Sequence, residues 1–322
     1  MSLARRRGLR VLRWGALLLV TVLLVLAARR LDLARVLDEL ARARPGWIVL
    51  ALGCFACILP LWAWQWRLLV PHESRPRFST MLGVIAMTST VLNTTPLLVG
   101  EAAGVFFLVV EAGLSRVAAV SMLAMDQLFV GLAKLFVIAG AAATTPLPLR
   151  ITRGAYALLA VVGILLAAIV VVAWRAEWLA GAAHRVLPAR AVTLVASLDA
   201  ALAPIRSPAR SGGALALALA KKCAEALAIL CVQRAFGVRL EPGSALLILA
   251  TTNLATLLPV VPGNLGVYEG AVTLAYAWLG VPPERAVGIG IVQHACYFAA
   301  LALPGYRWLA RSAPARKTPA AA

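Results

Sequence analysis

Carboxylates and an imidazole occur inside long apolar stretches of this 322-residue chain. The carboxylates are Glu101, Asp126 and Glu269, and the imidazole is His294. Charged side chains are costly inside membrane spans and usually face a bundle interior or a water-filled cavity. Carboxylates in such a place could hold an amine or carry a proton, and the start of a neighbouring helix could bind a phosphate group. These residues are the first candidates for a polar site.

Proline and glycine interrupt the apolar sequence just before Glu269. Proline removes a backbone donor and clashes with the preceding helical turn. Freed peptide groups in hydrocarbon cost several kcal/mol each unless they are satisfied, so broken backbone at that depth must be buried in protein or line a polar cavity. The candidate site residues of this segment are Asn253, Pro262, Gly263, Asn264, Gly266 and Glu269.

An earlier segment has the same order of residue types. Its candidate site residues are Asn93, Pro96, Gly100 and Glu101. Asp126 follows Glu101 by 25 residues, and His294 follows Glu269 by 25 residues. Paired, Gly/Pro-interrupted segments in the two halves of a transporter point to a binding site at the midplane. We therefore predict an internal repeat with halves at about 47–174 and 211–305, joined by an interfacial connector at about 175–210.

Simpler structural roles are open for the same residues. Asp126 could pair with Lys134 two turns on, and Lys221 could pair with Glu225 at helical spacing. Lys221 and Lys222 could also mark the membrane interface. The three asparagine amides could satisfy the broken backbone instead of a substrate, and His294 could bond to a neighbouring carbonyl.

The composition indicates a polytopic membrane protein. Hydrophobic residues make up 62% of the chain and charged residues 14%, with a mean hydropathy of +0.89, whereas soluble domains carry about 25% charged residues. The length leaves room for about seven or eight helices of roughly 20 residues. We expect an all-α, single integral membrane domain over residues 1–322, with two pseudo-symmetric repeats and broken or re-entrant segments.

The apolar segments give approximate boundaries for these helices. Residues 17–28 predict a retained first transmembrane helix, and residues 31–44 predict an amphipathic helix at the interface. Trp62, Trp64 and Trp66 close the second predicted span and are expected at headgroup level. The remaining predicted spans are 47–70, 80–112, 117–143, 154–174, 212–236, 244–280 and 286–304.

The net charge of +18 comes mostly from arginines in tails and loops. Anionic lipid surfaces attract such clusters, so we expect a lipid surface as partner and no nucleic acid. Arginines before the first span and after the last favour cytoplasmic placement of both termini. Cys54 and Cys57 form a CxxC with no second ligand pair, so neither a metal nor another cofactor is expected.

Pro-Gly-Asn-Leu-Gly-Val-Tyr-Glu at 262–269 resembles the Pro-Gly-Gly-Leu-Gly-x-x-Glu signature of the lysylphosphatidylglycerol synthase transmembrane family, also described as flippase-like proteins. Asn93 to Pro96 with Gly100 and Glu101 resembles that family's earlier element, and Asp126 lies where the family tends to have an acidic residue. Asn264 replaces the second glycine of the signature, and Ala102 to Gly104 stand where members often carry arginine. The hopanoid-associated subgroup is compatible with the sequence.

The resemblance implies a translocating membrane domain without the aminoacyl-transferring soluble domain of bifunctional members, because the chain ends at Ala322. We therefore expect a non-enzymatic flippase or transporter of a polar or phosphate-bearing lipid in the inner membrane. One alternative is a membrane-embedded enzyme acting on a lipid or polyprenyl phosphate, with Glu269 and His294 as acid and base. Another is a scaffold that partners lipid-biosynthesis enzymes.

Overall fold

The structure is a computed structural model that describes residues 32–70, 75–96, 99–145, 207–257 and 261–312, with isolated positions between 153 and 164. Every regular element within these ranges is helical, which confirms the predicted all-α membrane class. The predicted helix at 17–28, the segment 154–174 as a whole, and most of the connector 175–210 lie outside the described residues.

The described helices follow the predicted segments closely. In the first half they are α2 (Leu33–Ala41), α3 (Pro45–Ala56), α4 (Ile58–Leu69), α5 (Phe78–Thr94), α6 (Val99–Val110) and α7 (Arg116–Thr144). In the second half they are α11 (Pro208–Ala235), α12 (Gly243–Ala255), the 3₁₀ turn η3 (Pro262–Asn264), α13 (Val267–Trp278), α14 (Pro283–Leu301) and α15 (Leu303–Ser312).

Helix α2 is short and amphipathic. The Asp32 carboxylate caps it by accepting from the backbone N–H groups of Ala34 and Arg35, which satisfies donors that a helix start leaves unpaired. Leu33 and Leu37 are exposed. A bidentate ion pair from Arg285 to Glu39, at 2.9 and 3.0 Å, ties α2 to the first turn of α14. The exposed leucines fit the predicted interfacial position, which stays a prediction.

Among the described residues, three helical stretches are long and apolar enough to cross a membrane: Pro45–Leu69, Arg116–Thr144 and Pro283–Arg311. Helices α5, α6 and α12 are apolar but shorter. At 1.5 Å per residue, none of these three would cross roughly 30 Å of hydrocarbon alone. The polar breaks predicted from the sequence are what divide these apolar segments.

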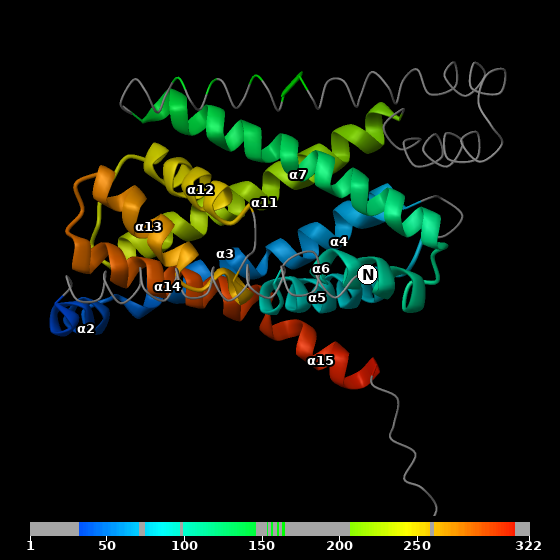
Figure 1. The fold of residues 1–322 in the computed structure, drawn as a ribbon, viewed down its shortest axis with the longest axis horizontal. Coiled ribbons are helices and arrows are strands. Elements are labelled where there is room, and N and C mark those ends of the chain that lie inside the picture. Colours follow the sequence, from blue (N-terminus) through cyan, green and yellow to red (C-terminus); the bar gives the residue numbers. More distant parts are fainter. Residues whose placement is uncertain are drawn as a thin grey trace, which may run out of the picture.

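The helices pack in matched pairs across the two halves. Within the first half α4 packs on α5, and within the second half α11 packs on α12. Between the halves, α3 contacts α14, and α11 contacts α7. Likewise α5 contacts α14, and α12 contacts α7. Figure 1 shows α5 and α6 on one side of α3, α4 and α11, with α12 and α13 on the other. A pseudo-two-fold relation would require these pairings, although the symmetry itself stays a prediction.

Two of the three tryptophans at the end of α4 face the interior of the bundle, and their expected position at headgroup level stays a prediction. Trp66 has no exposed surface, and Trp62 lines an internal cavity. Trp64 is half exposed. The aromatic cluster at the end of α4 therefore faces inward at two of its three positions, because α5 and α11 cover this part of the helix.

Candidate functional site

The two broken segments contact each other. Helix α5 ends at Thr94, Thr95 is extended, and α6 begins at Val99. In the second half the 3₁₀ turn η3 packs against α5. A β-carbon placed on Gly263 would lie 3.0 Å from the Asn93 carbonyl oxygen, which is tighter than an ordinary contact. Both predicted breaks are present, and their backbones touch.

Hydroxyl groups stabilise the helix before each break in the same way. Thr90, Thr94 and Thr95 donate to carbonyls four residues earlier in α5. Thr252 and Thr256 do so around the end of α12. Such bonds satisfy a hydroxyl within its own helix and tend to bend that helix. The polar runs that predicted the breaks therefore satisfy much of their own hydrogen-bonding capacity.

In the first break, Asn93 and Gly100 have structural contacts. The Asn93 amide donates to the Ser89 carbonyl oxygen at 2.8 Å. A β-carbon on Gly100 would lie 2.5 Å from Leu92 Cα, so glycine allows α6 to approach α5 closely. Pro96 lies just beyond the end of α5. Glu101 is in the first turn of α6, and its Oε2 atom is buried without a hydrogen-bond partner among the described residues.

In the second break, Glu269 holds the restarted helix in place. Gly266 has φ 81° and is the N-cap of α13. Its backbone N–H donates to Glu269 Oε2 at 2.7 Å. The other oxygen, Oε1, lies 2.8 Å from His294 Nδ1 on α14. The predicted 25-residue step from Glu269 to His294 is therefore a direct contact.

Asp126 is completely buried and faces α4 and α11. Trp62 donates its indole N–H to Asp126 Oδ2 at 3.4 Å, and Lys221 Nζ lies 4.0 Å from Oδ1. The Lys221 ammonium also lies 5.1 Å from the Trp62 ring centroid. The pairing suggested for Asp126 with Lys134 is absent among the described contacts, because α11 brings Lys221 to the carboxylate instead.

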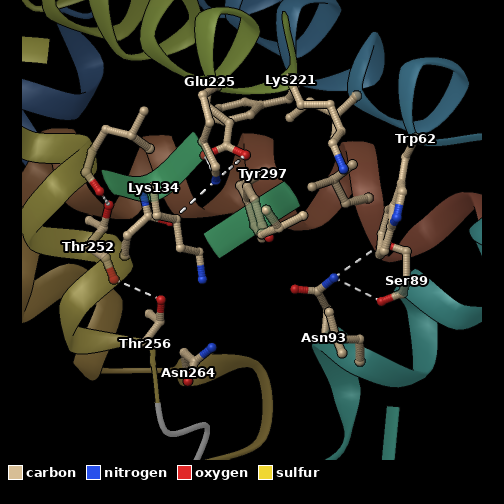
Figure 2. Close-up of a pocket in the computed structure, with 18 of the residues that line it drawn as sticks. Trp62, Ser89, Asn93, Lys134, Lys221, Glu225, Thr252, Thr256, Asn264 and Tyr297 are labelled. Atoms are coloured by element: carbon tan, nitrogen blue, oxygen red, sulfur yellow. Dashed lines mark hydrogen bonds and ion pairs between the residues drawn. The ribbon is translucent and has the colours of Figure 1, made fainter. Parts of the chain in front are cut away.

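Lys222 forms a second charged pair. Its Nζ lies 2.8 Å from Glu225 Oε2 and donates to Asn253 Oδ1 at 3.3 Å. The suggested Lys221–Glu225 pair is thus replaced by Lys222–Glu225. Lys134 of α7 makes no ion pair with a described carboxylate. In Figure 2, Lys221 and Glu225 lie on one side of the pocket, and Asn93 and Asn264 lie on the opposite side.

These residues surround a cavity of about 300 Å³ between the two breaks. Of the predicted site residues, the cavity is lined by Asn93, Glu101, Asp126, Asn253, Gly263, Asn264 and His294. Pro96, Gly100, Pro262, Gly266 and Glu269 are outside the lining and shape the backbone around it.

The predicted site left out several cavity residues that carry polar or charged groups, among them Trp62, Lys134, Lys221, Lys222 and Glu225. Adjacent lysines inside the apolar segment 212–236 were a usable signal, because charges within spans tend to face a cavity. Trp62 gave no signal in sequence beyond its place near a span end. Among the described residues, no group of three or more His, Cys, Asp or Glu side chains is arranged to hold a metal ion.

The cavity can hold a polar group of either sign. Three lysines and three carboxylates line it, and two of the lysines lie beside Asp126 and Glu225. Lys134 and Glu101 lack such a described partner. An ammonium with no ion-pair partner among the described residues is suited to bind an anion such as a phosphate.

Comparison with known proteins agrees with the resemblance carried by the two motifs. The family model described as the lysylphosphatidylglycerol synthase TM region matches residues 13–305. A search of curated proteins gave no significant match. The family match covers both breaks, the charged residues of α7 and α11, and the contact between Glu269 and His294.

Proposed function

Because this chain belongs to the lysylphosphatidylglycerol synthase transmembrane family of lipid-handling membrane domains, we propose that it translocates a phosphate-bearing lipid across the membrane. The observation that carries this proposal is the cavity between the two broken segments, with three lysines from α7 and α11 on its wall. The match is to the family as a whole and selects no subgroup.

Lys134 is the proposed contact for the phosphate. Lys221 and Lys222 are held by Asp126 and Glu225, at 4.0 and 2.8 Å. Lys221 and Lys222 add positive potential to the cavity, while the Lys134 ammonium has N–H donors available for a new partner. The cavity volume of about 300 Å³ is at the lower end of typical ligand pockets. It suits a headgroup, and the acyl chains would stay in the surrounding lipid.

Movement of the headgroup requires the cavity to open in turn to each side of the membrane. In many transporters one repeat rocks against the other around a central site. Here the breaks from the two halves touch at Gly263 and Asn93, and α7 and α14 each pack against the other half. We propose that these contacts separate and re-form as the headgroup passes.

A membrane-embedded enzyme is the second candidate, because the Glu269–His294 contact places a carboxylate beside an imidazole that could act as acid and base. Glu269 Oε2 is held by the Gly266 N–H, and Oε1 by His294. Both oxygens are thus engaged within the chain, and Glu269 is not part of the cavity lining. We therefore propose a structural role for the pair and a non-enzymatic protein.

We also propose in which membrane the protein lies and which partners it contacts. We place it in the inner membrane with both termini cytoplasmic, because basic residues are concentrated near both ends of the chain. Anionic lipid surfaces and lipid-biosynthesis enzymes are the proposed partners. These are expectations from charge and from the family, and no cofactor is proposed.

Translocation can be tested with the purified full-length chain in mixed phosphatidylcholine and phosphatidylglycerol vesicles. Acyl-labelled fluorescent phosphatidylglycerol is then followed by chemical quenching from outside. Lys134→Met should slow protein-dependent movement at least about tenfold, because a charge-assisted contact to phosphate is worth about 1.5–3 kcal/mol.

Arg116→Met is the matched control. Arg116 is exposed in the first turn of the same helix, α7, so its loss should leave the rate unchanged. Equal rates for wild type and Lys134→Met, with normal thermal unfolding, would contradict the proposed role of the cavity. Absence of protein-dependent movement in the wild type would contradict translocation itself.

A further inference from the structure

Two asparagine amides of the cavity have complementary atoms that lack a partner. Asn264 Oδ1 is a buried acceptor and Asn253 Nδ2 is a buried donor, and neither has a hydrogen-bond partner among the described residues. The orientation of Asn253 is fixed because its Oδ1 accepts from Lys222 Nζ at 3.3 Å. Unmet buried donors and acceptors are costly, so these two atoms are suited to a ligand.

The backbone of Asn264 gives a second, independent observation. Its φ is 53°, and no other non-glycine residue of the described part of the chain has a positive φ. Glycine adopts this conformation freely, while asparagine does so at some cost. Strained backbone of this kind is concentrated at ligand sites. Asn264 therefore places an amide at a position whose backbone alone would favour glycine.

The kinds of group that can use both atoms are few. A hydroxyl can donate to Asn264 Oδ1 and accept from Asn253 Nδ2. An ammonium can only donate, and an ionised phosphate oxygen can only accept. Both amides line the cavity, so a group that can donate and accept, as a hydroxyl does, satisfies them better than an ammonium or a phosphate oxygen alone.

The charged residues also disfavour an amine headgroup. An ammonium would bind best to a carboxylate, but Asp126 and Glu225 already lie beside Lys221 and Lys222. Glu101 is the remaining carboxylate of the cavity. The three lysines that line the cavity would repel an added cation, whereas they would attract a phosphate.

We propose that Asn253 and Asn264 form a subsite for the hydroxyl groups of a polyol or sugar headgroup. The substrate is then a phosphodiester lipid whose phosphate is bound by Lys134 and whose hydroxylated part lies against the two amides. This inference rests on the proposed function for the lipid nature of the ligand. It adds the chemical class of the headgroup and names Asn264 as its specificity residue.

The test is a titration of the purified full-length protein with four water-soluble dihexanoyl lipids. Phosphatidylinositol and phosphatidylglycerol carry hydroxyl groups, phosphatidylmethanol has the same phosphodiester without them, and phosphatidylethanolamine carries an amine. The wild type should bind the better hydroxylated lipid about tenfold more tightly than phosphatidylmethanol, which corresponds to about 1.4 kcal/mol.

Two substitutions isolate the subsite. Asn264→Gly removes the amide and suits φ 53°, so the protein should stay folded and the preference should fall to within about twofold. Asn253→Asp keeps the oxygen that Lys222 contacts and replaces the donor by an acceptor. Its added charge acts on all phosphodiesters alike, so the ratio of affinities reports the lost donor.

The binding results test the hydroxyl subsite, and lipid movement is measured separately. A preference for inositol over glycerol or the reverse identifies the source of the hydroxyls, and either supports the subsite. Equal binding of phosphatidylmethanol, tightest binding of phosphatidylethanolamine, no binding, or a preference that survives Asn264→Gly would overturn it. Equal binding together with lipid movement would leave the proposed function standing. A clear preference without movement would contradict translocation alone.

Discussion

Glu101 and Glu269 occupy matching places in the two broken segments, yet their surroundings differ. Glu269 is engaged by Gly266 and His294. Glu101 Oε2 is buried and has no hydrogen-bond partner in the part of the chain that the structure describes. Because Glu101 lines the cavity and Glu269 does not, we infer that the first contacts the headgroup and the second stabilises a helix start.

Glu101→Gln should therefore slow lipid movement at least about tenfold, since a hydrogen bond to a charged group is worth about 1.5–3 kcal/mol. It should change the free energy of unfolding by less than about 1 kcal/mol, the usual size of the interaction between an acidic residue and a helix N-terminus. Vesicle transport and thermal unfolding of the same preparation measure the two quantities.

Glu269→Gln is the matched comparison, with the same change in size and charge. It weakens the contacts to the Gly266 N–H and to His294, so its main effect should be a lower unfolding temperature. A large loss of stability in Glu101→Gln, or wild-type transport by it, would show that the two carboxylates do not divide their roles in this way.

At the scale of the elements, the site depends on how η3 turns. Gly263 has φ 63° and lies against the Asn93 carbonyl oxygen, and Gly266 has φ 81° at the start of α13. An L-residue in the left-handed region costs roughly 1–2 kcal/mol. The turn therefore needs glycine for its conformation, and at Gly263 also for the close approach of α5.

Gly263→Ala should lower the free energy of unfolding by about 1–3 kcal/mol, combining backbone strain with the displaced contact to Asn93. Thermal unfolding in detergent is the measurement, and lipid movement should fall with it. Gly53→Ala is the control. A β-carbon there would meet nothing within 4 Å, and alanine is favoured over glycine in a helix such as α3. Equal unfolding temperatures for the two variants would contradict the packing described for η3.

The position of each break could be predicted from sequence because proline, glycine and hydroxyl runs have local effects on the backbone. The boundaries of α7, α11 and α14 could be predicted because each of these helices follows the limits of one apolar segment. The partners of Asp126 could not be predicted. Lys134 is close in sequence, but Lys221 reaches the carboxylate from α11, and only the tertiary packing decides between them.

The inward position of Trp62 was missed for a similar reason. An indole near a span end indicates depth in the membrane but not the direction in which the ring faces, and here α5 and α11 cover α4. The Glu269–His294 contact could be anticipated, because α13 and α14 are consecutive antiparallel helices and the two residues lie on either side of their short connection. The approach of the two breaks could be predicted from their matched patterns, but the side-chain partner that a distant helix supplies, such as Lys221 for Asp126, could not.

For the whole molecule, the reciprocal packing suggests how the cavity could serve both sides of a membrane. Helix α7 of the first half packs on α11 and α12, and α14 of the second half packs on α3 and α5. Each half thus holds one long helix of the other. If the halves are equivalent, exchange of their conformations would reverse the opening of the cavity without a change in these pairings.

The most direct test of this account is a density map of the purified full-length protein in a lipid nanodisc that contains phosphatidylglycerol. We predict headgroup density inside the cavity, with the phosphate beside Lys134 and the glycerol hydroxyls toward Asn253 and Asn264. The central claim would be contradicted by a map with well-resolved cavity side chains and ordered headgroups only on the outer surface of the bundle.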